Sequence, residues 1–62
     1  MQLNLPYNLS MEKNKVIELA GSQVALAKLL GISQAAVAQW GEFVPIARQW
    51  QLRLLKPDWF KL

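Results

Sequence analysis

Residues 22–40 of the chain read SQVALAKLLGISQAAVAQW and predict two short helices joined by a tight turn. Gly31 follows the apolar residues of the first helix, at a position where helices commonly end in a left-handed residue. Ser33 comes two residues later, and its hydroxyl can cap the free backbone N–H groups of the second helix. Ile32 stands between these two signals and can pack against both helices. The sequence therefore predicts a helix-turn-helix.

Further helices are predicted on both sides of this motif. Ser10 is expected to cap a helix that closes at Gly21. The buried side of that helix should comprise Val16, Ile17, Leu19 and Ala20. Pro45 suits the first position of a last helix, which should end near Leu55 because Pro57 disfavours helical geometry in the residue before it. The expected fold class is therefore all-α, a compact bundle of four to five short helices.

The composition predicts one small domain spanning residues 1–62. Hydrophobic residues make up 53% of the chain, which is more apolar material than so small a core should hold. The chain has no cysteine and no histidine, so we expect no disulfide, no metal site and no cofactor. No apolar run reaches the roughly 20 residues of a membrane span, and residues 1–9 lack the features of a signal peptide. We therefore expect a cytoplasmic protein whose residues 1–9 form an arm, a short edge strand or a frayed terminus.

Catalysis has little support in the sequence. The acidic residues are Glu12, Glu18, Glu42 and Asp58. The first two are spaced so that they do not share one helix face, and the serines before the predicted helices have no evident base to activate them. Seven Lys and Arg against four Asp and Glu give a net charge of +3, which favours an anionic partner such as nucleic acid. We therefore predict a binding protein and not an enzyme.

The second helix of the motif separates into two faces. The core-facing residues are Ala36, Val37 and Trp40. The opposite face is small and uncharged and comprises Gln34, Ala35, Ala38 and Gln39. Glutamine can form a bidentate contact with adenine, and an alanine methyl group can touch the methyl group of thymine, so this face could read A/T-containing steps. The alternative is that both glutamines are ordinary solvated surface.

This motif resembles the helix-turn-helix of the phage Cro and repressor family. The resemblance is carried by Gln23, Ala27, Gly31, Ile32 and Val37, and by the segments ELAG, ALAKLLGIS, AV, QW and VP within residues 16–48. It implies that Gln34, Ala35, Ala38 and Gln39 occupy base-reading positions in the major groove. It also implies that Gln23 clasps a phosphate and that Lys28 and Ser33 contact the DNA backbone. Strand-like alternation is weak after residue 45, so the all-helical form of the family is expected.

Other cations could extend this DNA-binding surface. We predict a phosphate contact for Lys28 and also for Arg48. Lys13, Lys15 and Arg53 could contribute if the fold brings them to the same side. The alternative is that most of these side chains are solvated helix surface.

The C-terminal part of the chain carries apolar residues on more than one side of its helix. One arc comprises Ile46, Ala47, Trp50 and Leu54, and Leu52 and Leu55 lie elsewhere. Residues 56–62 are expected to pack on the core or to dimerise. Their aromatic residues could fold back on the core, but we predict a homodimer, because it would bury surface that a small monomer exposes. The predicted dimer contacts are Trp50, Leu54, Trp59 and Phe60.

These features predict a transcriptional regulator that binds double-stranded DNA. The expected form is a repressor that binds a pseudo-palindromic operator as a homodimer, with residues 33–40 in the major groove. A phage or prophage origin is implied by the resemblance. The alternative is a protein-interaction module, such as an antitoxin or adaptor, that uses the helix-turn-helix as a scaffold and docks a different protein on its apolar C-terminal segment.

Overall fold

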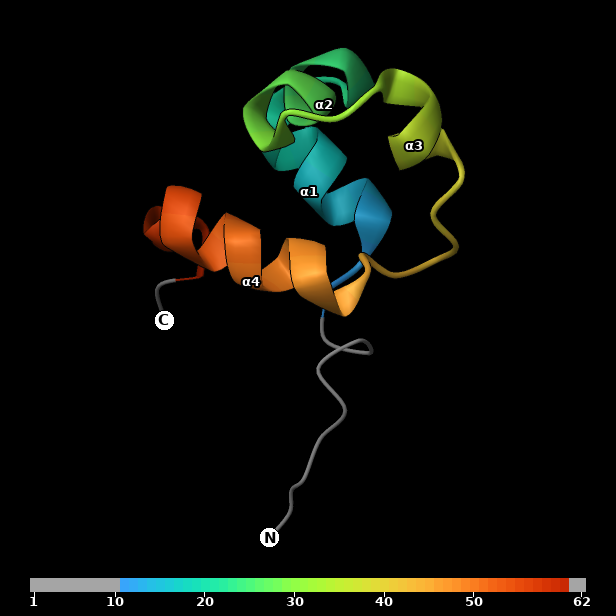
Figure 1. Cartoon of the computed structure of the whole chain (residues 1–62). Coiled ribbons are helices and arrows are strands. Elements are labelled where there is room, and N and C mark those ends of the chain that lie inside the picture. The colour runs from blue at the N-terminus through green and yellow to red at the C-terminus, as the bar shows by residue number, and fades with distance from the viewer. Residues whose placement is uncertain (1–10, 61–62) are drawn as a thin grey trace, which may run out of the picture.

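The computed structural model describes residues 11–60, which fold into short helices without an extended sheet. The elements are α1 (Lys13–Ala20), α2 (Gln23–Leu30), α3 (Gln34–Ala38), α4 (Ile46–Leu55) and a 3-10 helix, η2 (Pro57–Phe60). In Figure 1, α2 and α3 lie at the top of the molecule, α4 lies at the bottom, and α1 lies between them. The predicted all-α class is confirmed. Within the described residues, no helix is long and apolar enough to cross a membrane.

The turn between α2 and α3 forms as predicted. Gly31 ends α2 in the left-handed region, with φ 74° and ψ 30°. The N–H of Ile32 donates to the carbonyl of Ala27 at 3.0 Å, which is one of the two hydrogen bonds of a Schellman motif. Ser33 then caps α3, because its Oγ accepts a hydrogen bond from the N–H of Ala36 at 3.1 Å. Residues of the turn itself therefore end α2 and start α3.

Helix α1 begins later than predicted. Glu12 precedes the helix in an extended conformation and its side chain makes no capping hydrogen bond, while Ser10 lies outside the described residues. Glu12 forms an antiparallel bridge with the loop after α3, in which the N–H of Val44 donates to the carbonyl of Met11 at 2.9 Å. The prediction of Ser10 as the cap was wrong because this long-range pairing keeps Met11 and Glu12 out of the helix, which starts at Lys13.

The apolar core of the described residues draws on every α-helix and on the bridge. It comprises Met11, Val16, Leu26, Ala27, Leu30, Val37, Val44 and Leu52. Trp40, Trp59 and Phe60 are half-buried against it, so the aromatic residues of η2 do fold back on the core. Leu19 was expected in the core but is 45% exposed, because it lines a hollow beside Trp59 and Phe60 at the edge of α1.

Helix α3 is shorter than the predicted segment 33–40. It ends at Ala38, with Gln39 as its C-cap residue, and Trp40 lies beyond it. The Nζ of Lys13 donates to the carbonyl of Trp40 at 3.1 Å. The chain then runs from α3 to the start of α4 beside the beginning of α1, as Figure 1 shows. Contact with α1 therefore replaces the last turn that the sequence pattern predicted.

Helix α4 buries a face that carries both apolar and polar side chains. Leu52 is fully buried and Gln49 is only 1% exposed. Ile46, Trp50 and Leu54 recur every four residues on the outer side and are 46%, 51% and 84% exposed. The apolar arc predicted for this helix therefore faces solvent, and a glutamine lies in the core.

The ends of α4 agree with the sequence to within one residue. Pro45 precedes the helix as its N-cap residue instead of occupying the first helical position. The helix ends at Leu55, and the N–H of Lys56 donates to the carbonyl of Leu52 at 2.7 Å. Pro57 then opens η2. The predicted stop before this proline is confirmed.

Candidate DNA-binding surface

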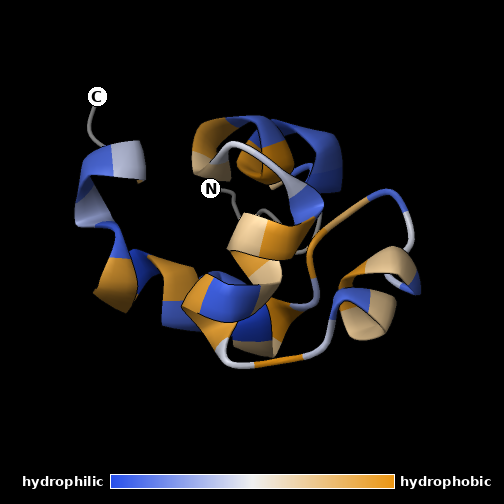
Figure 2. Cartoon of the chain, turned by 90° about the horizontal axis from the view of Figure 1, so that it is seen from above, coloured by the Kyte–Doolittle hydropathy of each residue, from blue (hydrophilic) through white to orange (hydrophobic). Residues whose placement is uncertain are grey.

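The outer side of α3 is the candidate base-reading surface. The predicted base-reading residues are all exposed: Gln34, Ala35, Ala38 and Gln39. Val37 on the opposite side is fully buried. The helix carries no charged residue, and its alanines give it largely apolar colours in Figure 2. Because small side chains flank the two amides, the backbone of α3 can approach base edges closely.

The N-terminal ends of α2 and α3 meet at one edge of this surface. Gln23, the first residue of α2, places its Nε2 3.5 Å from the carbonyl oxygen of Gln34, the first residue of α3. Ser22 caps α2 by accepting the N–H of Ala25 at 3.0 Å, just as Ser33 caps α3. The positive ends of two helix dipoles therefore lie near each other, which favours an anion at this edge.

The two cations predicted to contact phosphate have different surroundings. Lys28 lies in the last turn of α2 and is exposed, and its ammonium group makes no hydrogen bond or ion pair with residues 11–60. Arg48 is half-buried on α4, and its Nη1 donates to Oε1 of Gln51 at 2.6 Å. The ammonium group of Lys28 is therefore available to a phosphate without rearrangement. Arg48 would first have to break its hydrogen bond to Gln51.

Two further cations are engaged within the protein. The ammonium group of Lys13 is held by the carbonyl of Trp40, so it supports the end of α3. The guanidinium carbon of Arg53 lies 5.1 Å from the ring centroid of Phe60 and 5.9 Å from that of Trp50, within cation–π range. The supporting role of Lys13 was missed, because its partner is 27 residues away and no local pattern signals the contact.

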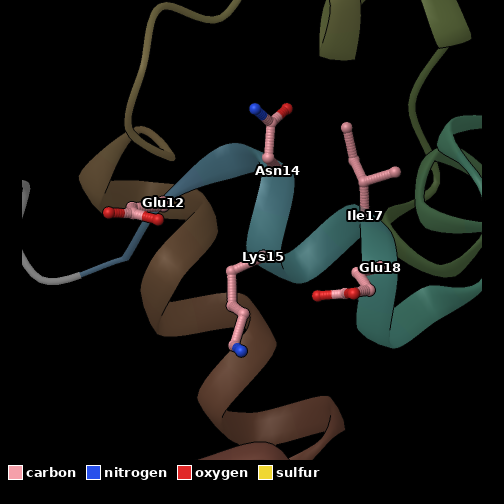
Figure 3. Close-up of a pocket in the computed structure, with 5 residues that line it drawn as sticks. All are labelled: Glu12, Asn14, Lys15, Ile17 and Glu18. Atoms are coloured by element: carbon pink, nitrogen blue, oxygen red, sulfur yellow. The ribbon is translucent and has the colours of Figure 1, made fainter.

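The outer face of α1 carries charges of both signs. Figure 3 shows Lys15 between Glu12 and Glu18, with Asn14 and Ile17 completing a shallow hollow. One lysine with two carboxylates leaves this face without a net positive charge. Lys15 therefore does not extend the surface formed by α2 and α3.

The capped helices α2 and α3, joined by the short turn at residues 31–33, form a helix-turn-helix, the motif of a large class of DNA-binding proteins. Residues 12–56, which include all of α1 to α4, match the model of a family described as the DNA-binding transcriptional regulator Cro. The chain therefore belongs to the Cro family of transcriptional regulators. The resemblance seen in its sequence is confirmed.

A phage protein is similar to this chain over most of its length. The regulatory protein cro of Salmonella phage P22 is 47% identical over 45 residues, which cover 73% of this chain and 74% of that protein. No solved structure matches the chain. The family consists of DNA-binding regulators and is not a class of enzymes. These comparisons favour a regulator over the protein-interaction module that was the alternative.

Proposed function

We propose that this protein is a repressor that binds a pseudo-palindromic operator as a homodimer. Each subunit would be a single helix-turn-helix domain that lays α3 in the major groove. Half-sites would lie about one helical turn, ~34 Å, apart, as is usual for dimeric helix-turn-helix proteins. The exposed, uncharged face of α3 is the observation that carries the proposal. Binding would repress by excluding polymerase, with no catalytic step, in the cytoplasm of a bacterium that carries a phage or prophage.

The proposed contacts divide between base edges and the DNA backbone. Base edges would be read by Gln34, Ala35, Ala38 and Gln39. Phosphates would be bound by Gln23, Lys28, Ser33 and Arg48. Backbone contacts set the position of the protein along the duplex, and base contacts supply the discrimination. Gln23 supports both tasks, because its amide lies at the junction of α2 and α3.

The proposed dimer interface lies on the other end of the molecule from α3. Leu54 is 84% exposed, and Ile46 and Trp50 continue the same stripe along α4. Trp59 and Phe60 keep part of their surface open beside it, because η2 packs against α4. Burying such apolar side chains between two copies is favourable by roughly 25 cal/mol per Å². An exposed apolar stripe of this kind suits a second copy of the same chain, with the guanidinium group of Arg53, which lies over the rings of Trp50 and Phe60, at its border.

Replacing Gln34 and Gln39 by alanine is expected to remove most of the sequence discrimination. Each bidentate amide contact that is lost should reduce the preference for operator over mismatched duplex by about 1–3 kcal/mol. Fluorescence anisotropy on an operator selected from random duplexes measures this preference. Circular dichroism must still report a helical fold, because both side chains are exposed. Unchanged affinity and selectivity in the folded variant would contradict the base-reading role of α3.

Salt dependence tests the proposed phosphate contacts one residue at a time. Each phosphate neutralised adds about 0.9 to the slope of log affinity against log salt concentration, so Lys28→Ala should lower that slope by about this amount. Arg48→Ala should do the same if Arg48 leaves Gln51 on DNA. Lys15→Ala is the matched control, because Lys15 lies on the mixed-charge face of α1. An equal loss of slope for Lys15→Ala would show only an effect of net charge.

A further inference from the structure

Gln51 joins α4 to the end of α2 through its side-chain amide. Its Nε2 donates to the carbonyl of Leu30 at 3.0 Å, and its Oε1 accepts from Nη1 of Arg48 at 2.6 Å. Leu30 is the last residue of α2, where helix carbonyls have no partner within the helix. Gln51 therefore supplies a donor to the helix-turn-helix from a different element.

The chemistry of its two partners fixes the direction of this amide. A guanidinium group can only donate hydrogen bonds, and a backbone carbonyl can only accept them. The amide oxygen of Gln51 must therefore face Arg48, and the amide nitrogen must face Leu30. Arg48 lies three residues before Gln51 on the same helix, so the orientation is set within α4 itself. The charged donor also strengthens the contact that holds the amide.

This bond is directional, unlike the packing of Leu52, and it reaches α2, whereas the hydrogen bond from Gln49 ends on Val44 just before α4. Leu52 is fully buried and resists separation of α4 from the rest of the fold, but hydrophobic contact does not depend on direction. A hydrogen bond weakens steeply when it is bent, so it restrains the angle of the helix. Gln51 therefore limits rotation of α4 relative to α2.

The angle of α4 matters because the two ends of the molecule would have different tasks. The exposed stripe of Ile46, Trp50 and Leu54 lies on α4, and the reading surface lies on α3, which the capped turn ties to α2. The second-longest dimension of the molecule is 23 Å. Over that length, a rotation of α4 by roughly 10° displaces the opposite end of the molecule by about 4 Å. One base pair rises by about the same distance, ~3.4 Å.

We propose that Gln51, through its hydrogen bond to the carbonyl of Leu30, is the positioning residue that sets the direction of α4 relative to the helix-turn-helix, and thereby the half-site spacing that the protein selects. The effect on half-site spacing rests on the proposed homodimer. The direction of α4 is a property of the single chain and can be tested without DNA. Gln51 itself need not touch DNA in either case.

The spacing is tested with duplexes whose half-sites are moved closer or further apart by one base pair. The wild type should prefer one spacing by roughly tenfold, a difference of about 1.4 kcal/mol. Gln51→Met removes both hydrogen bonds, and Gln51→Glu keeps the contact with Arg48 but cannot donate to Leu30. Both variants should lose most of the preference, measured as the ratio of affinities for duplexes of different spacing, because any effect that acts through Arg48 lowers the affinity for all of these duplexes alike. A variant that keeps the full preference overturns the proposal.

Two controls separate positioning from a general loss of stability. Ile17→Ala trims a half-buried side chain on α1, away from α4, and should lower stability while leaving the spacing preference intact. Residual dipolar couplings of backbone N–H groups report the direction of α4 relative to α2 and α3 in the single chain. The axis of α4 in Gln51→Met should shift by roughly 10° or more, and an unchanged axis would refute the positioning role. A wild type without any spacing preference would refute the homodimer instead, and the couplings would still decide the role of Gln51.

Discussion

Gln49→Glu is expected to destabilise the folded protein by about 3–5 kcal/mol at pH 7, the usual result of leaving a charge buried without a partner. Gln49 is 1% exposed, and its Nε2 donates to the carbonyl of Val44 at 2.8 Å. Its Oε1 has no hydrogen-bond partner among residues 11–60. Glutamate has almost the same shape but places a second acceptor against the Val44 carbonyl. Thermal and urea unfolding measure the loss.

The pH dependence of this variant gives a sharper test than its stability at one pH. Burial should raise the pKa of the new carboxyl group above the ~4.3 of an unfolded glutamate. Below about pH 4.3 the carboxyl is protonated in both states, and its O–H can donate to the Val44 carbonyl as the amide did. Stability relative to wild type should therefore be greatest in acid and fall as the pH rises through the raised pKa.

Gln39→Glu is the matched control for this substitution. Gln39 is exposed, so the same chemical change should alter the free energy of unfolding by no more than about 0.5 kcal/mol at any pH. If Gln49→Glu also fell within that limit, position 49 would have to be open to water, contrary to its burial.

Leu54→Glu is expected to reduce operator affinity by roughly 10²–10⁴-fold, because two half-sites would no longer be held by one linked protein. Leu54 is 84% exposed, so the single chain loses little packing, and at a concentration where wild type is monomeric the variant should unfold at nearly the same temperature. A charge placed in an apolar interface opposes association, since it would lose its hydration there. Sedimentation and duplex binding, measured together, give the two readouts.

Val24→Glu provides a comparison with the same change of side chain on a different surface. Val24 is 43% exposed on α2, away from the proposed interface. The substitution Val24→Glu should therefore leave the sedimentation of the protein without DNA unaffected. A wild type that sediments as a monomer even at high concentration, with and without operator, would contradict the dimer. The stripe on α4 would then be available to a different protein, which is the alternative that the C-terminal sequence first raised.

Local signals in the sequence were sufficient to predict the helix-turn-helix. Gly31 and Ser33 act on backbone groups within a few residues of themselves, so the end of α2 and the start of α3 could be located without knowing the rest of the fold. The two faces of α3 were equally predictable, because helical periodicity separates Val37 from the exposed residues. The predicted base-reading residues are exposed in the structure, as expected. Their contacts with DNA stay a prediction.

Contacts between distant residues decided the rest. The bridge between Glu12 and Phe43 delayed the start of α1, and the bond from Lys13 to Trp40, 27 residues apart, supports the end of α3. Periodicity could not show which side of α4 turns inward, because both sides carry apolar residues. The buried side of α4 is the one with Gln49, whose amide donates a hydrogen bond to the carbonyl of Val44.

Local sequence signals are enough to specify the helix-turn-helix, whereas contacts between distant residues fix how it is connected to α4. A cap or a left-handed glycine is a property of a few consecutive residues, so its energy is already present in the local chain. The bond from Gln51 to Leu30 exists only when residues 21 apart are brought together, and side-chain type alone does not indicate which carbonyl an amide will reach. The surface that would meet DNA could therefore be found in the sequence, and the angle at which two copies would present it depends on the folded chain.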